Sequence, residues 1–302
     1  ILKIGVNSTF QHAINHETNS GSFANALAMP SVIPVYNPDE PSGKGGFGYG
    51  SADFPTYSSN PVAIQKSYEG LNVNNRVIAN GFVELKPIKH LTYKLNVGVD
   101  AWFGRNKYIN HCYTMRMASG ETRYNDVLTD NRDQRITTLV ENTLTYDNTF
   151  GKHHITALVG HTAEDVNWHW LQNQGYNQQV PGLWEIDLVG KQNDMQGSEQ
   201  ERRQLSYIGR LDYNYAERYL LQFNFRSDGS SKFGPNNRRG YFPSLSLGWR
   251  VSEEKFWEPV KHIVDNLKLR ASWGKVGDMQ SLGNYSYIPS IDHSGPYEGL
   301  YA

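Results

Sequence analysis

The sequence predicts an all-β fold of antiparallel strands. Apolar and polar residues alternate with a period of two along many segments, which places them on opposite faces of a strand. In residues 241–251 every odd position holds an apolar residue or Pro, whereas Ser244, Ser246, Gly248 and Arg250 take even positions. The 302-residue chain contains about nine such segments and almost no pattern of a long helix.

Most of the predicted strands have one continuous apolar face. Leu2, Ile4 and Val6 form this face in the first segment. Leu267, Leu269 and Trp273 form it in the last. The alternation is weaker in the second and fifth segments. In chain order, the predicted strands cover residues 2–11, 76–86, 91–100, 136–147, 155–166, 205–215, 219–226, 241–251 and 267–274.

The connections between these strands predict a transmembrane β-barrel. Short turns at 87–90, 151–153 and 216–218 alternate with long polar connections. The long connections, predicted at 12–73, 105–133 and 168–203, would therefore all leave the sheet at the same edge. Short periplasmic turns and long extracellular loops are typical of outer-membrane barrels. Runs of about 10 to 14 residues also suit a tilted membrane strand.

A membrane would explain the two faces of each strand. In a closed barrel Leu245, Leu247 and Trp249 would meet lipid, while Ser246 and Gly248 would face a wet lumen. Aromatic residues near strand ends are expected at the headgroup level. We expect Tyr213, Tyr215, Tyr219, Tyr241 and Trp102 there. A soluble sheet with its apolar side on a core would show the same alternation.

Composition narrows the function classes. The net charge is −1 without a run of Lys or Arg, so nothing indicates nucleic-acid binding. Cys112 is the single cysteine, which excludes an internal disulfide and a Cys-based metal cluster. No apolar run approaches the length of a membrane helix. The chain begins within a strand pattern, so we expect it to be part of a larger protein.

One block of the sequence resembles a known family. Residues 225–234, 237–244 and 248–252 read FRSDGSSKFG, NRRGYFPS and GWRVS. Together with LKLRASWG at 267–274, they resemble the SusC/RagA family of TonB-dependent transporters of the Bacteroidota outer membrane. PVY at 34–36 and NPVA at 60–63 follow the order of that family as well. Residues 277–280, GDMQ, depart from the Gly-Asn more usual there.

The resemblance implies a barrel of 22 strands with an N-terminal plug, energised through TonB. It also implies a SusD-like surface lipoprotein as partner and uptake of glycan or peptide fragments across the outer membrane. Residues 1–302 would be part of the barrel domain, because the sequence shows no plug, TonB box or C-terminal closing strand. The expected surroundings are outer-membrane lipid.

Residues typical of catalytic or metal sites are not arranged for such chemistry. Cys112 adjoins His111, but adjacency in sequence does not make a catalytic dyad, and no Gly-x-Ser-x-Gly element is present. His12 and His16 could bind a metal if their segment were helical, but no second pair supports them. We therefore predict no catalytic residue, no metal, no cofactor and no enzyme activity.

Ligand contact is predicted in the Gln- and Asn-rich segment 167–204. Aromatic rings can stack on sugar rings or apolar side chains, while amides bind hydroxyl and peptide groups. The candidate residues are Trp168, Trp170, Tyr176 and Trp184. Alternatively, Trp168 and Trp170 could belong to the outer aromatic girdle.

Two other functional classes remain possible from the sequence. A secreted soluble β-sandwich that binds carbohydrate would share the alternation. An outer-membrane barrel enzyme would need acidic or His residues converging at the extracellular rim.

Overall fold

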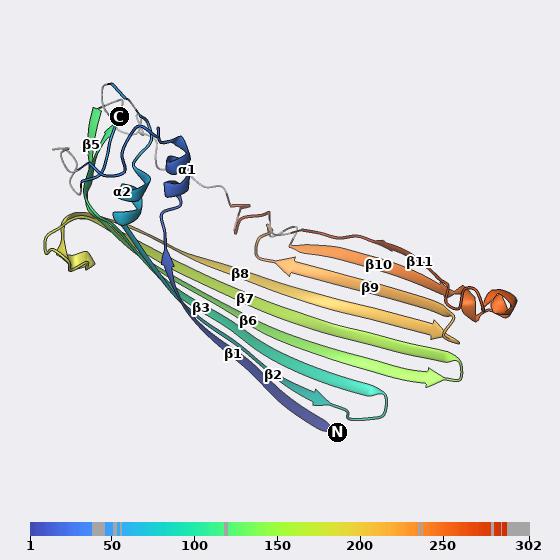
Figure 1. Cartoon of the computed structure of the whole chain (residues 1–302). Coiled ribbons are helices and arrows are strands. Elements are labelled where there is room, and N and C mark those ends of the chain that lie inside the picture. The colour runs from blue at the N-terminus through green and yellow to red at the C-terminus, as the bar shows by residue number, and fades with distance from the viewer. Residues whose placement is uncertain are drawn as a thin grey trace, which may run out of the picture.

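Nine antiparallel strands form one sheet in which every strand pairs with its neighbours in chain order (Figure 1). The computed structural model describes residues 1–37, 46–50, 53–54, 56–117, 120–234, 236, 238–278, 281–284 and 286–288. The sheet strands are β1 (Leu2–Glu17), β2 (Tyr68–Leu85), β3 (Leu91–Asn110), β6 (Val127–Phe150), β7 (His153–Gln178), β8 (Val189–Tyr215), β9 (Tyr219–Ser230), β10 (Arg239–Arg250) and β11 (Lys268–Gly274).

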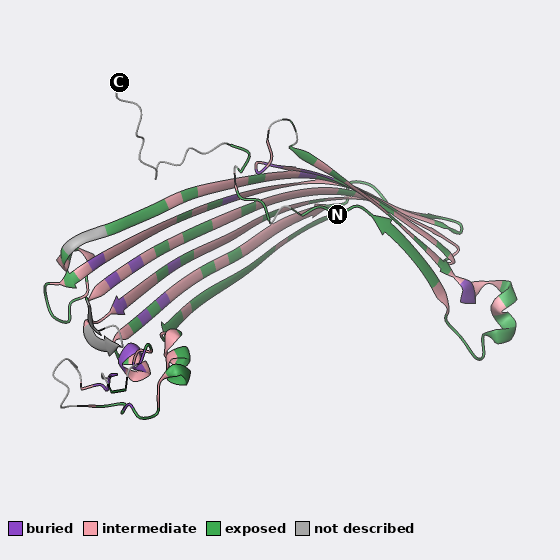
Figure 2. Ribbon diagram, turned by 90° about the horizontal axis from the view of Figure 1, so that it is seen from above, coloured by how far each residue is buried: buried purple, intermediate pink, exposed green. Residues whose placement is uncertain are grey.

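The sheet is a single curved and twisted layer, a partial and unclosed barrel (Figure 2). Within the described residues no second sheet packs on its apolar face, so the β-sandwich alternative is wrong. The prediction of nine antiparallel strands is confirmed. No helix in the described ranges has the length and apolar character needed to cross a membrane.

The register divides the sheet into a polar face and an apolar face. Trp102 of β3 pairs with Arg135 of β6, which pairs with Trp168 of β7, so these three side chains share the polar face. Ala101 and Phe103 lie on the opposite, apolar face. Trp102 was therefore wrongly predicted at the headgroup level, because the pleat turns it away from the apolar side of its strand.

The apolar face carries its apolar residues in a limited band. On β6 the band runs from Ile136 to Tyr146, and on β7 it runs from Ile155 to Ala163. Arg132, Asp165 and Arg203 occupy the apolar face beyond the band. Both faces of the sheet consequently carry charged and polar residues in this outer part, with separate apolar residues such as Leu128 and Leu171 among them.

The strands are much longer than the sequence predicts. β7 has 26 residues and β8 has 27, so most of the predicted loop 168–203 is strand and only residues 179–188 connect the two. The first and last residues of the predicted loops 12–73 and 105–133 are also part of strands. Alternation signals a strand only where one face is apolar, and beyond the band backbone pairing continues without that signal.

The connections differ between the two ends of the sheet. At the loop end, residues 18–67 hold helices α1 (Gly21–Ala28) and α2 (Pro61–Lys66), and residues 111–126 hold the hairpin β4 (Tyr113–Met117) and β5 (Gly120–Tyr124). Figure 1 shows these elements at one end of the strands and the tight turns at the other.

The turn end contains tight reversals and one longer connector. His90, Gly151, Ala216 and Glu217 have φ between 53° and 65°, the left-handed conformation that permits sharp turns. Between β10 and β11 lie the short 3₁₀ helices η3 (Val251–Glu253) and η4 (Lys255–Val260). This connector is longer than the β7–β8 connection, so long and short connections do not alternate strictly.

Residues 18–67 contain a small packed unit of their own. Asn60 caps α2 by accepting hydrogen bonds from the backbone N–H groups of Val62 and Ala63 at 3.0 and 3.2 Å. Its amide donates to the carbonyls of Val35 and Gly48 at 2.9 and 3.0 Å. Asn60 therefore joins two segments that are distant in sequence, which gives a physical role to the similarity at 34–36 and 60–63.

Candidate functional site

A cavity of about 720 Å³ lies on the polar face. Strands β2, β3, β6, β7 and β8 each contribute side chains to it. Its walls mix charged groups, amides and aromatic rings. The lining residues are Arg76, Asp100, Trp102, Asp133, Arg135, Thr137, Val166, Trp168, Gln200, Arg202, Lys232 and Asn284.

Five of these residues form one straight row across neighbouring strands. The row, called here the cross-strand row, contains Arg76, Trp102, Arg135, Trp168 and Gln200, each directly opposite the next. The two Trp residues are separated by one strand, so their backbones lie about 10 Å apart. Aromatic and hydrogen-bonding groups thus alternate along the row.

Gly104 permits the position of the Trp102 ring. A Cβ atom at Gly104 would lie 2.8 Å from both Cη2 and Cζ2 of Trp102. The ring therefore lies close over the backbone of Gly104, its neighbour on the same face of β3. A larger residue at this position would displace the ring from the cavity wall.

Ion pairs hold most of the charged groups on the polar face. Arg76 donates to both carboxylate oxygens of Asp100, at 2.8 and 2.6 Å. Arg202 pairs with Glu164. The bidentate pair with Asp100 fixes the orientation of the Arg76 side chain.

Two polar groups close one side of the cavity. Lys232 is only 9% exposed and donates from Nζ to the carbonyl of Leu282 at 2.6 Å. The amide of Asn284 donates to Gln200 Oε1 at 3.0 Å. These contacts place part of the chain that follows β11 against the β8 and β9 side of the cavity.

Asp133 lies beyond the apolar band, on the part of β6 that carries polar residues on both faces. Partial burial raises the pKa of the Asp133 carboxyl, and a hydrogen bond with Trp168 opposes this shift. Charge on Asp133 is thus disfavoured by the loss of solvent and favoured by the indole N–H.

The predicted ligand residues do not form one site. Trp168 lines the cavity, and Trp170 lies one position further along the same face of β7, opposite Asp133. Both are on the polar face, so their alternative assignment to an outer aromatic girdle is wrong. Tyr176 lies near the outer end of β7, opposite Val127.

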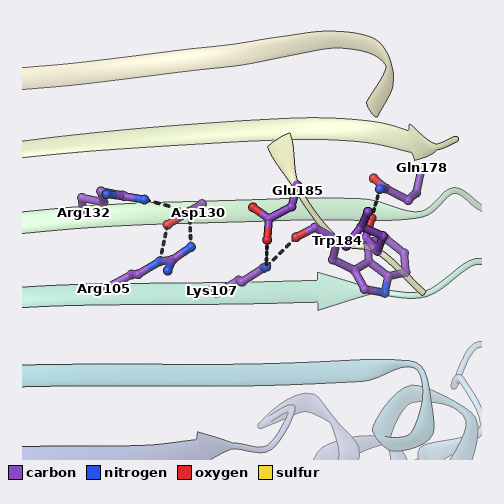
Figure 3. A network of polar contacts seen from close by, with 8 residues as sticks. Arg105, Lys107, Asp130, Arg132, Gln178, Trp184 and Glu185 are labelled. Atoms are coloured by element: carbon purple, nitrogen blue, oxygen red, sulfur yellow. Dashed lines mark hydrogen bonds and ion pairs between the residues drawn. The ribbon is translucent and has the colours of Figure 1, made fainter. Parts of the chain in front are cut away.

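Trp184 lies elsewhere, in the connection between β7 and β8 (Figure 3). Its carbonyl accepts a hydrogen bond from Lys107, and its indole meets the edge of the His111 ring at a centroid distance of 5.0 Å. Lys107 lies on the same face of β3 as Ala101 and Phe103, which is the apolar face. Trp184 is therefore separated from Trp168.

The contacts beside Trp184 form an ionic network (Figure 3). Lys107 pairs with Glu185 at 3.5 Å. Asp130, which is 8% exposed, accepts from Arg105 at 3.3 and 2.9 Å and lies 3.7 Å from Arg132. The network holds the β7–β8 connection against β3 and gives Trp184 a structural role.

The described residues contain no group of three or more His, Cys, Asp or Glu arranged to hold a metal. His12 and His16 lie on strand β1 instead of a helix, and His12 hydrogen-bonds Asn75 at 2.8 Å. Four residues span about 13 Å along a strand, too far for two ligands of one ion.

The sequence could not identify Trp102, Arg76 and Arg135 as parts of the same site as Trp168. They lie on three strands whose register follows from pairing in three dimensions. One feature of the sequence could have pointed to these residues, which is a large or charged side chain at a position of the polar face. Trp102, which alternates with Ala101 and Phe103 of the apolar face, is such a residue.

The fold and the site define a class of protein. A curved antiparallel sheet with one apolar band, one polar face and its largest connections at one end is a segment of an outer-membrane β-barrel wall. The cavity lies on the lumen side of such a wall.

Comparison with known proteins identifies the family. The family model described as "TonB dependent receptor-like, beta-barrel" matches residues 11–301. The chain belongs to this family. Receptors of this family lie in the outer membrane, which makes the apolar band the lipid-facing surface and the loop end extracellular. The predictions of a SusC/RagA-type barrel segment and of an outer-membrane location are confirmed.

The relatives are about three times longer than this chain. It is 27% identical to the TonB-dependent receptor SusC of Bacteroides thetaiotaomicron, over 95% of this chain and 30% of SusC. It is 34% identical to the TonB-dependent receptor P3 of Formosa agariphila, over 54% of this chain and 15% of P3. Membership of a receptor family also supports the prediction that the chain is not an enzyme.

Solved structures show the same fold. The RagAB peptide transporter superposes with a TM-score of 0.73 at 23% identity, covering 94% of this chain and 32% of the solved chain. The "open-open" state of the RagAB peptide importer gives a TM-score of 0.70 at 20% identity, over 93% and 31% of the two chains.

Proposed function

We propose that the protein containing this chain takes up nutrient fragments, glycan or peptide, across the outer membrane in a TonB-dependent manner. The observation that carries the proposal is the cavity on the lumen face, level with the outer edge of the apolar band. It offers two Trp rings with charged and amide groups between them. Aromatic faces bind sugar rings or apolar side chains, and the polar groups orient hydroxyl or peptide groups.

The mechanism needs no bond-making chemistry. Ligand would bind in the lumen, and energy delivered by TonB would release it into the periplasm through a plug. A SusD-like surface lipoprotein is the proposed partner at the loop end, where α1, α2 and the β4–β5 hairpin lie. Residues 1–302 would supply part of the barrel wall, with the plug, TonB box and closing strands of the barrel outside them.

The proposed contact residues are Trp168 and Trp102, with Trp170 one position further out. Tyr176 lies at the outer entrance of the same face, whereas Trp184 is not part of this contact. A strain lacking the gene would identify the nutrient by its failure to grow on one glycan or peptide source. The gene is then restored as wild type, as the double variant Trp102→Ala/Trp168→Ala, or as Trp184→Ala.

We expect the double variant to restore growth poorly at limiting nutrient, because each lost stacking contact weakens ligand binding. Trp184→Ala serves as the matched control and should restore growth fully if surface expression is equal. Full growth with the double variant would refute the proposed binding site. Normal growth of the deletion strain on every nutrient tested would refute the uptake function.

A further inference from the structure

Arg135 occupies the centre of the cross-strand row, between Trp102 and Trp168. Its side chain is exposed and lines the cavity. Among the described residues Arg135 has no hydrogen bond and no ion pair. A guanidinium presents five N–H donors and remains charged, so its binding capacity is open to a ligand.

The other cations of the cavity are engaged. Arg76 is held by Asp100, Arg202 by Glu164, and Lys232 donates to the carbonyl of Leu282. Arg135 thus differs from the other cavity cations in making no hydrogen bond or ion pair within the described residues, although its charge interacts over a longer distance with Asp100.

The cavity carries a small excess of positive charge, because Glu164, outside the lining, neutralises Arg202. Its lining includes four cations, Arg76, Arg135, Arg202 and Lys232, against the two carboxylates Asp100 and Asp133. Asp133 is the acidic residue next to Arg135 on the same face of β6, and it forms no ion pair among the described residues. Partial burial disfavours its charged form.

The surroundings of Arg135 favour a flat anion. The two Trp residues lie on the strands on either side of it, about 5 Å away along the sheet. A carboxylate can accept two parallel hydrogen bonds from one guanidinium, which adds orientation as well as attraction. The apolar part of such a ligand could then contact an indole ring.

We propose that this cavity binds ligands through a carboxylate group held by Arg135, with Trp102 and Trp168 contacting the atoms on either side of it. The chemical class is a carboxylate-bearing nutrient fragment, either a uronate-containing oligosaccharide or a peptide with an acidic side chain. This inference rests on the proposed uptake function and adds the charge of the ligand to it.

The test uses two pairs of probes, and in each pair one member carries a carboxylate that is replaced by a neutral ester or amide in the other. The first pair is trigalacturonic acid and its fully methyl-esterified form. The second pair is Ala-Ala-Glu and Ala-Ala-Gln, both amidated at the C-terminus. Binding to the full-length protein in detergent is measured by calorimetry. The charged member of at least one pair should bind about 10- to 100-fold more tightly than its neutral partner.

Arg135→Gln should abolish this preference, because it should weaken binding of the charged probe far more than binding of the neutral probe. Arg135→Lys should keep part of it, because the charge remains but the paired donors are lost. Arg132→Gln is the matched control, since Arg132 lies on the same strand but on the opposite face, and it should keep the full preference.

The outcome also separates the two sources of carboxylate. A preference within the sugar pair indicates a uronate ligand, and a preference within the peptide pair indicates an acidic peptide. Equal binding within both pairs, absence of binding by both charged probes, or an unchanged preference in Arg135→Gln would overturn the inference. None of these results affects the growth experiment, on which the uptake function depends.

Discussion

At the residue scale, the lumen face depends on residues whose neighbours come from other strands. Trp102 illustrates this, because its ring lies over Gly104 while its backbone pairs with Arg76 and Arg135. The missing side chain at Gly104 leaves room for the Trp102 ring, and this does not depend on the backbone flexibility of glycine. A small change at this position should therefore act on the site rather than on the fold.

Gly104→Ala should displace the Trp102 ring, because the new Cβ would lie 2.8 Å from two ring atoms. The end of the ring can move, so we expect a stability cost near the lower end of about 1–3 kcal/mol. We also expect a shift in tryptophan emission and weaker nutrient binding.

The matched control for this change is Gly98→Ala on the same face of β3. Its added Cβ would have its nearest neighbours at 3.8 Å, an ordinary contact distance. Equal effects of the two substitutions on tryptophan emission would contradict the described ring position.

At the element scale, each strand is a ladder with one lipid-facing and one lumen-facing side. β10 shows the division clearly, since Leu245, Leu247 and Trp249 lie on one face and Ser244 and Ser246 on the other. Neighbouring residues of β10 should therefore respond very differently to the same charge.

Leu247→Arg places a charge on the lipid face. It should destabilise the folded barrel in lipid by about 2–4 kcal/mol if the residue lies near the bilayer midplane. Ser246→Arg places the same charge in the lumen and should cost much less. Equilibrium folding of the full-length protein into vesicles would measure both. Similar losses for the two variants would count against the assignment of faces.

The turn end of β9 and β10 is held by Glu254. The carboxylate accepts hydrogen bonds from the Tyr219 hydroxyl at 2.6 Å and from the Trp249 indole at 3.2 Å, and it lies 3.4 Å from Arg218. The bond from Tyr219, followed by that from Trp249, lowers the pKa of Glu254. One carboxylate thus joins two interfacial aromatic residues and the β8–β9 turn.

A lowered pKa in the folded state means that Glu254 stabilises the fold when it is ionised. This stabilisation is complete above the ordinary pKa of a Glu carboxyl, about 4.3, and is lost as the pH falls through the lower folded value. We expect Glu254→Gln to melt at a lower temperature than wild type at pH 7, with the difference shrinking below about pH 4.

Glu258→Gln is the control for this comparison, because Glu258 is an exposed residue of the same connector. Its melting temperature should follow that of wild type at every pH. A difference between Glu254→Gln and wild type that stays constant down to pH 3 would show that the carboxylate charge is not responsible.

At the scale of the whole molecule, the described sheet has two open edges. β1 and β11 each pair with one neighbour within the described residues, although a membrane requires every backbone group of a barrel to be paired. Open edges also promote association between chains. The nine-stranded wall thus requires further pairing at both edges to be stable in lipid.

Residues 1–302 expressed alone should therefore not refold into a stable monomer. We expect broad, aggregated material in size-exclusion chromatography in detergent and no heat-dependent shift on electrophoresis. A version that includes the rest of the barrel should show both a single peak and the shift. A monodisperse, heat-shifting fragment would contradict the requirement for further strands.

The sequence by itself determined the fold class, the number of strands in the main sheet and the identity of its two faces inside the membrane, but not the separate β4–β5 hairpin. It did so because lipid on one side and water on the other impose a strict two-residue alternation. It did not determine where the strands end, because beyond Ile136 or Ala163 both faces of the sheet carry polar residues and the regular alternation disappears.

The site was predicted only in part, and for a related reason. The sequence marks Trp168 and Trp184 alike as candidate ligand residues, because both are aromatic and both lie close to polar residues in the chain. Only the tertiary structure separates them, since register places Trp168 opposite Arg135 and in one row with Trp102, whereas Lys107 and His111 contact Trp184 elsewhere. Contacts between strands depend on how the strands align, and no local pattern records that alignment.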